Sequence, residues 1–82
     1  MAHEKQRFWL TFGENLCQRP IICELGRSFD LVFNIRSAQV TQSTGIVAIE
    51  LEGEREVLKL AIQWLEKEGV TVEPVELSTI EG

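Results

Sequence analysis

The sequence predicts an α+β fold, a sandwich in which a four-stranded antiparallel sheet carries two helices on one face. Two patterns predict it. Several segments alternate apolar with polar residues, which is typical of half-buried strands, and two other segments repeat apolar residues at helical spacing. The order of these segments along the chain is strand, helix, strand, strand, helix, strand.

The first strand is expected over residues 7–12, where the apolar side chains alternate in position. Its core side is expected to hold Phe8, Leu10 and Phe12, and its other side Arg7, Trp9 and Thr11. The residues before this strand, including His3, are expected to fray. Residues 13–15 have the composition of a turn.

Pro20 marks the start of the first helix, because its missing N–H group is not needed in a first helical turn. Apolar residues follow at helical spacing as far as Phe29. A long, β-branched second strand is then expected from Leu31 to Val40. Alternation along this strand places Asn34 and Arg36 on the same face.

Residues 42–45 predict a hairpin turn, because Gly45 tolerates the positive φ that such loops demand. A third strand follows and ends at Gly53. The second helix is expected over residues 54–68, where an apolar stripe runs at helical periodicity until Gly69 stops it. A last strand is expected over residues 70–73, exposed or ending at Pro74.

This order, with one hairpin and two helical crossovers, is the ferredoxin-like βαββαβ arrangement. Right-handed crossovers place both helices on one face of the sheet, so the opposite face is open to solvent or to a partner. We therefore expect functional groups on that open face. Its expected members are Trp9, Thr11, Asn34, Arg36, Ile46, Ala48, Glu50 and Glu73.

The length of 82 residues fits one domain, residues 1–82, with a core over about residues 7–77 and frayed termini. A formal charge of -5 with scattered basic residues argues against nucleic-acid binding. No stretch approaches the roughly 20 apolar residues that span a bilayer, and the first residues lack the apolar core of a signal peptide. We therefore expect a cytoplasmic protein with no membrane insertion.

The residues whose side chains could bind zinc through sulfur or imidazole nitrogen are Cys17, Cys23 and His3. They are too few for a closed zinc site, and the two thiols are expected to stay reduced. No nucleophile has a base close to it in the predicted fold, since the only histidine lies in the terminal segment. The sequence thus predicts no metal, no other cofactor and no catalytic residue.

Several motifs together resemble the NIL domain family, a ferredoxin-like module named for an Asn-Ile-Leu motif. They are the FG that ends the first strand, RSF, NIRSAQ, the glycine before the third strand, ELEG, and AIQWLEKEGVTVEPV. These motifs extend from Arg7 to Val75. One position differs, because Arg36 stands where the family usually has leucine.

The resemblance implies a regulatory function. NIL domains follow the ATPase subunit of methionine ABC importers, where they pair and bind methionine to inhibit transport, and they also occur joined to iron-sulfur modules. This chain has neither a GxxxxGK[ST] phosphate loop nor a cysteine cluster, so the resemblance implies the regulatory module alone. By the same resemblance, Asn34 contributes to an amino-acid pocket near a subunit interface, with Ile35 and Arg36 as neighbouring ligand-binding candidates.

Each of these residues also has a simpler interpretation. Asn34 on an exposed strand can be merely solvated, and Arg36 can pair with Glu50 or another acid across the hairpin instead of binding a ligand. Trp9 on the outward face suits an interface, yet single exposed aromatic residues are common on monomers.

The leading hypothesis is a stand-alone regulatory domain that acts as a homodimer and senses an amino acid such as methionine. The alternative is a protein–protein interaction module that has no small ligand and docks on an unknown protein partner through its open sheet face or a strand edge. A ligand-dependent change in the amide spectrum distinguishes the two.

Overall fold

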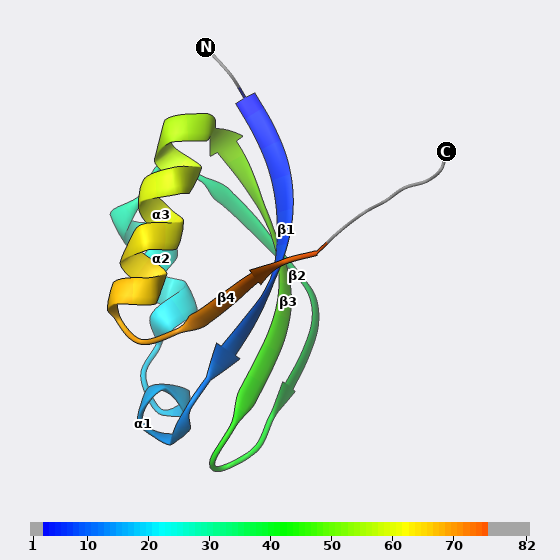
Figure 1. Ribbon diagram of the computed structural model, residues 1–82, viewed down its shortest axis with the longest axis vertical. Helices are drawn as coiled ribbons and strands as arrows, with labels where there is room; N and C mark the ends of the chain where they lie inside the picture. Colours follow the sequence, from blue (N-terminus) through cyan, green and yellow to red (C-terminus); the bar gives the residue numbers. More distant parts are fainter. Residues whose placement is uncertain (1–2, 76–82) are drawn as a thin grey trace.

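The computed structural model describes residues 3–75. Its elements, in chain order, are β1 (His3–Phe12), α1 (Glu14–Cys17), α2 (Ile21–Ser28), β2 (Val32–Val40), β3 (Gly45–Glu54), α3 (Arg55–Lys67) and β4 (Thr71–Pro74). The strands form one sheet in the order β2-β3-β1-β4, and each neighbouring pair is antiparallel. Figure 1 shows α2 and α3 on the same side of this sheet. The predicted α+β, ferredoxin-like βαββαβ fold is therefore confirmed.

The core lies between the sheet and the two long helices. The inward sides of β1 and β3 hold Phe8, Leu10, Phe12, Val47, Ile49 and Leu51, all buried. They pack against buried residues of the helices, namely Ile21, Leu25, Leu58, Ala61 and Leu65. The alternation that predicted the core side of the first strand is thus confirmed, and no helix of the described part of the chain lies on the opposite side of the sheet (Figure 1).

Two features near the start of the chain differ from the prediction. Strand β1 begins at His3 rather than Arg7, because residues 3–6 pair with the end of β3, where His3 lies opposite Glu54. The second difference is α1, a single helical turn where the sequence indicated only a turn. It forms because Leu16 and Cys17 both donate backbone hydrogen bonds to the Gly13 carbonyl.

Strand β2 forms one edge of the sheet, and all nine of its residues are exposed. Among residues 3–75 its only hydrogen-bonding partner strand is β3, so no other described strand pairs with the outer edge of its backbone. The apolar side chains of this strand include Val32, Val40 and Ile35, which are 63%, 59% and 45% exposed. Helix α2 meets this strand at Phe33, whose ring lies against Gly26, but the residues of the strand remain exposed.

No helix within residues 3–75 is long and apolar enough to cross a membrane. The same residues contain no group of three or more His, Cys, Asp or Glu side chains that could hold a metal ion. Cys17 and Cys23 are both free, and Cys23 is exposed.

Candidate functional site

A hollow of about 230 Å³ lies on the open face of the sheet, above the point where β1, β3 and β2 run side by side. The residues that line it are Arg7, Phe8, Trp9, Arg36, Ser37, Ala48, Ile49 and Val75. The side chains of Phe8 and Ile49 belong to the core, so these two residues contribute backbone to the hollow. The remaining lining combines two guanidinium groups, a hydroxyl group and apolar surface.

The strand register explains why the sheet is hollowed here. Ala48 lies opposite Trp9 on one side and opposite Ser37 on the other, so a small side chain stands between a large one and another small one. Directly opposed residues on one face are close neighbours, so a methyl group at the centre of this row leaves space above it. The hollow is therefore the space above Ala48.

Arg36 reaches the hollow because of an irregularity in β2. Ile35 pairs with Ile49 and Ser37 with Ala48, so Arg36 is an extra residue with no partner in β3. An extra residue of this kind is a β-bulge, which bends the strand and re-aims a side chain. The bulge brings Arg36 and Ser37 to the same hollow.

The charged groups around the hollow are unevenly paired. Arg7 Nε donates to Glu50 Oε2 at 3.4 Å, a long contact that uses one of the five guanidinium N–H groups. The Glu50 side chain is 15% exposed. Within residues 3–75, Arg36 forms no ion pair, so the predicted pairing of Arg36 with Glu50 is wrong. Glu50 pairs with Arg7 because the two residues are directly opposed in the β1–β3 register.

The structure separates the predicted site residues. Trp9, which is 41% exposed, and Arg36 both line the hollow. Asn34 lies on the same face in the neighbouring row, opposite Glu50, and does not line the hollow. Ile35 opposes the buried Ile49, which places it on the other face of the sheet.

Ala48 was expected on the open face, and Phe8 and Ile49 are core residues; the other three lining residues, which were not predicted as site residues, are Arg7, Ser37 and Val75. Alternation along the first strand had placed Arg7 beside Trp9, so the signal for Arg7 was present. Ser37 depends on the bulge, which local sequence does not reveal. Val75 follows β4, and its N–H donates to the Arg7 carbonyl at 3.0 Å, a contact that depends on how distant strands pair.

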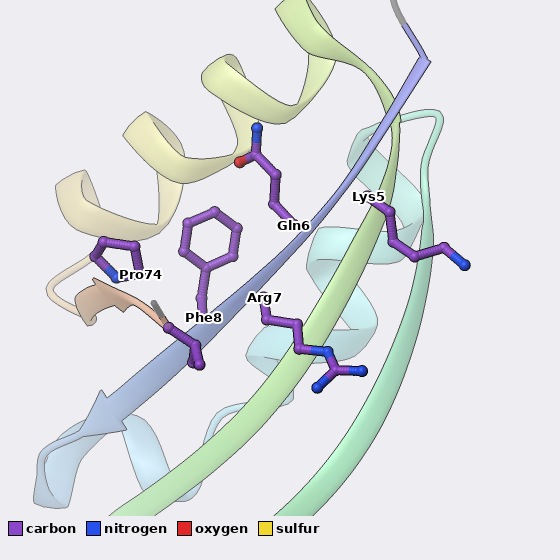
Figure 2. Close-up of a pocket in the computed structure, with 6 residues that line it drawn as sticks. Lys5, Gln6, Arg7, Phe8 and Pro74 are labelled. Carbon is purple, nitrogen blue, oxygen red and sulfur yellow. The ribbon is translucent and has the colours of Figure 1, made fainter. Parts of the chain in front are cut away.

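A second hollow, of about 270 Å³, lies at the free edge of β1, because β4 pairs only with Phe8 to Thr11. Figure 2 shows Gln6 and Phe8 of this hollow on the side of β1 that faces α3, with Lys5 and Arg7 on the opposite side. Its lining thus wraps around a strand edge and does not gather polar groups toward one point. The hollow above Ala48 is therefore the better candidate site.

Comparison with known proteins relates this chain to one domain family. The NIL domain family matches residues 6–74 of this chain. The methionine import ATP-binding protein MetN 2 of Acinetobacter baylyi is 31% identical over 74 residues, which cover 85% of this chain and 22% of that protein. This chain therefore corresponds to less than a quarter of that relative.

The fold also matches a solved structure, the crystal structure of the C-terminal domain of an ABC transporter / ATP-binding protein from Enterococcus faecalis. The TM-score is 0.76 with 23% sequence identity, over 89% of this chain and 86% of the other. At that identity the likeness concerns the fold alone.

Proposed function

Because the chain belongs to the NIL domain family, we propose that it is a regulatory domain that binds a small amino acid, such as methionine, and acts as a homodimer. The observation that carries this proposal is the hollow above Ala48, where Arg7 and Trp9 of β1 meet Arg36 of β2 on the open face. The similarity to a methionine import ATP-binding protein supports methionine as the first amino acid to test.

The groups around the hollow suit a zwitterion. The Arg36 guanidinium and the Ser37 hydroxyl can donate hydrogen bonds to a carboxylate, and a charge-assisted pair of this kind is stronger than a neutral one. In the neighbouring row, Glu50 and the side-chain carbonyl of Asn34 can accept hydrogen bonds from an ammonium group. Trp9 offers a half-exposed apolar wall for the side chain of the ligand. Asn34 would thus bind at the rim of the site.

The proposed homodimer joins two copies through β2. Its free outer edge can continue the sheet into a second copy, and its exposed apolar side chains, Ile35 among them, would be covered there. Charge supports this choice, because none of the 13 acidic residues falls within residues 31–49, which include the whole of β2. Two copies of an acidic protein can therefore approach along this strand with little like-charge repulsion.

Regulation would follow from the position of the ligand beside this edge. Arg36 and Ser37 belong to β2, so a ligand that holds them favours one arrangement of the paired strands over another. Trp9, on the same face, would contact the ligand or the partner subunit. We place the domain in the cytoplasm, where it would act on a protein partner such as a transporter ATPase, with no catalytic activity of its own.

A second candidate function is a protein interaction module without a small ligand. The observation that favours it is the exposure of every residue of β2, an edge that another protein could extend as readily as a second copy. In that case the hollow would have no ligand, and only protein partners would change the amide spectrum around β2.

The proposed function is tested by calorimetric titration of the full chain with L-methionine and a panel of other amino acids. We expect saturable binding that Asn34→Ala abolishes or weakens while its melting temperature stays within a few degrees of the wild type, because Asn34 is exposed. Unchanged affinity in the folded variant would remove Asn34 from the site. Absence of binding by any amino acid at millimolar concentration would favour the interaction module.

A further inference from the structure

The charges at the hollow above Ala48 carry an inference about the class of its ligand. We infer that the site prefers an acidic amino acid, with a net charge of minus one, over a neutral amino acid such as methionine. This inference rests on the proposed function, because it concerns the same hollow, and it narrows the ligand from amino acids in general to α-amino dicarboxylates.

The first step is the charge balance. The lining includes two permanently charged guanidinium groups, of Arg7 and Arg36, and the neighbouring Glu50 pairs with Arg7. A neutral zwitterion brings one carboxylate and one ammonium group, so the net positive charge around the hollow remains. An acidic amino acid brings a second carboxylate and neutralises it.

The second step is the number of available donors. Within residues 3–75, the guanidinium of Arg36 has no side-chain hydrogen bond, and that of Arg7 uses only Nε, toward Glu50. The two terminal nitrogens of Arg7 are therefore available to an incoming acceptor. Since a planar guanidinium matches a carboxylate in geometry, each arginine can hold one carboxylate of the ligand.

The third step is the placement of these groups on three strands. Arg7 is on β1, Glu50 on β3 and Arg36 on β2, so the three charges come from three strands. The two guanidinium groups line the hollow, and Glu50 lies beside it, directly opposite Arg7. An α-carboxylate at Arg36, an ammonium group at Glu50 and a side-chain carboxylate at Arg7 use all three. A methionine side chain would instead leave Arg7 opposite a thioether, which is a weak acceptor.

Other charges on the open face lie farther from Ala48. Glu73 opposes Trp9 from β4, on the side of Trp9 that is away from Ala48, and the pair of Lys5 and Glu52 is one row beyond Arg7 and Glu50. None of these three lines the hollow. A hollow of about 230 Å³ is also smaller than the roughly 300–1,000 Å³ of sites for drug-sized ligands, which fits a single small acid.

The test compares L-glutamate with L-glutamine, which have nearly the same shape and differ by one charge, and adds L-methionine. Dissociation constants of the full chain are measured by amide NMR titration at low ionic strength. We expect glutamate to bind about tenfold more tightly than glutamine or methionine, the effect of one charge-assisted contact at a partly exposed site. Arg7→Gln should remove the preference for glutamate, Arg7→Lys should keep part of it, and Arg36→Gln should weaken both ligands.

Arg27→Gln is the matched control, because Arg27 lies in α2, away from the open face, and forms no ion pair within residues 3–75. It should leave all affinities unchanged. Equal or tighter binding of methionine would overturn the inference and leave the proposed amino-acid binding intact. A preference for glutamate that survives Arg7→Gln in a folded variant would also overturn it. Failure of all three amino acids to bind would refute the inference, and failure of the whole panel of amino acids would refute the proposed amino-acid binding as well.

Discussion

Arg19 connects the segment before α2 to the end of α3, because its Nη1 donates a hydrogen bond to Glu68 Oε1 at 2.7 Å. The same guanidinium donates two hydrogen bonds to Glu24, from Nη2 at 2.7 Å and from Nε at 3.2 Å. One side chain thus links two helices that cover the sheet, and it does so with the bidentate geometry that favours arginine over lysine.

This link predicts a pH-dependent contribution to stability. The hydrogen bonds from Arg19 hold the pKa of the Glu24 carboxyl below its ordinary value of 4.5. Because the pKa is lower in the folded state, the stabilisation is complete above that ordinary value and is lost as the pH falls through the folded-state pKa. Arg19→Gln should therefore lower the melting temperature at neutral pH, and its difference from the wild type should shrink progressively below pH 4.5.

Thermal melts followed by circular dichroism across this pH range would measure the difference. Arg27→Gln serves as the control, since it removes the same charge from a residue without an ion pair in the described chain. A deficit for Arg19→Gln that stays constant while the carboxylate is protonated would show that the ion pair is not its cause.

Gly69 is predicted to resist substitution because of its backbone conformation. It follows α3 with φ of 103°, a region that residues with a Cβ rarely adopt. Gly69→Ala should lower the free energy of unfolding by about 1 kcal/mol. Gly13→Ala is the matched control, because Gly13 has φ of -80° and a Cβ added there would meet nothing within 4 Å, so its effect should stay within about 0.5 kcal/mol. Equal losses in urea unfolding would show that the backbone conformation of Gly69 is not the cause.

The dimer proposal predicts that a charge on β2 weakens self-association. Val40→Lys or Val32→Lys would place an ammonium group on a strand edge that the partner would cover, which should raise the dimer dissociation constant at least about tenfold. Leu60→Lys, on α3 and 54% exposed, makes the same change outside the proposed interface and should have no effect. Sedimentation equilibrium measures the dimer dissociation constant of all three variants. A dimer that tolerates both β2 variants must use another surface.

Filling the hollow should block the ligand. Ala48→Leu adds three carbons between Trp9 and Ser37 on the open face, where they displace no core side chain. Amino-acid affinity should fall at least about tenfold while the melting temperature is maintained. Gln39→Leu, one row away and outside the lining, should bind as the wild type does. Calorimetric titration measures these affinities. If Ala48→Leu binds the amino acid with full affinity, the ligand binds elsewhere on the domain.

The parts of the fold that the sequence predicted are those set by local alternation and periodicity. Phe8, Leu10 and Phe12 alternate strictly, and this pattern identified both faces of β1. The apolar stripe predicted within residues 54–68 likewise identified the buried side of α3, which holds Leu58, Ala61 and Leu65. These patterns are reliable because a strand or helix that is buried on one face must repeat its apolar residues with the period of that element.

The parts that were missed depend on pairing between distant segments. His3 joins β1 only because the end of β3 lies beside it, and its own neighbours are too polar to indicate a strand. The bulge at Arg36 arises where β2 adjusts its register to β3, so alternation alone could not bring Arg36 and Ser37 to one hollow. The exposure of β2 goes with its place at the edge of the sheet, and the order of the strands is not contained in any local pattern.

Amino-acid binding at the hollow above Ala48 is tested most simply by mapping where the ligand binds, with two-dimensional amide NMR of the labelled full chain during titration. We expect saturable shifts that are largest at Trp9, Ser37 and Ala48, with smaller ones at Asn34. Spectra unmoved by every amino acid at millimolar concentration would refute binding at this hollow. So would shifts confined to the free edge of β1 and the adjacent side of α3.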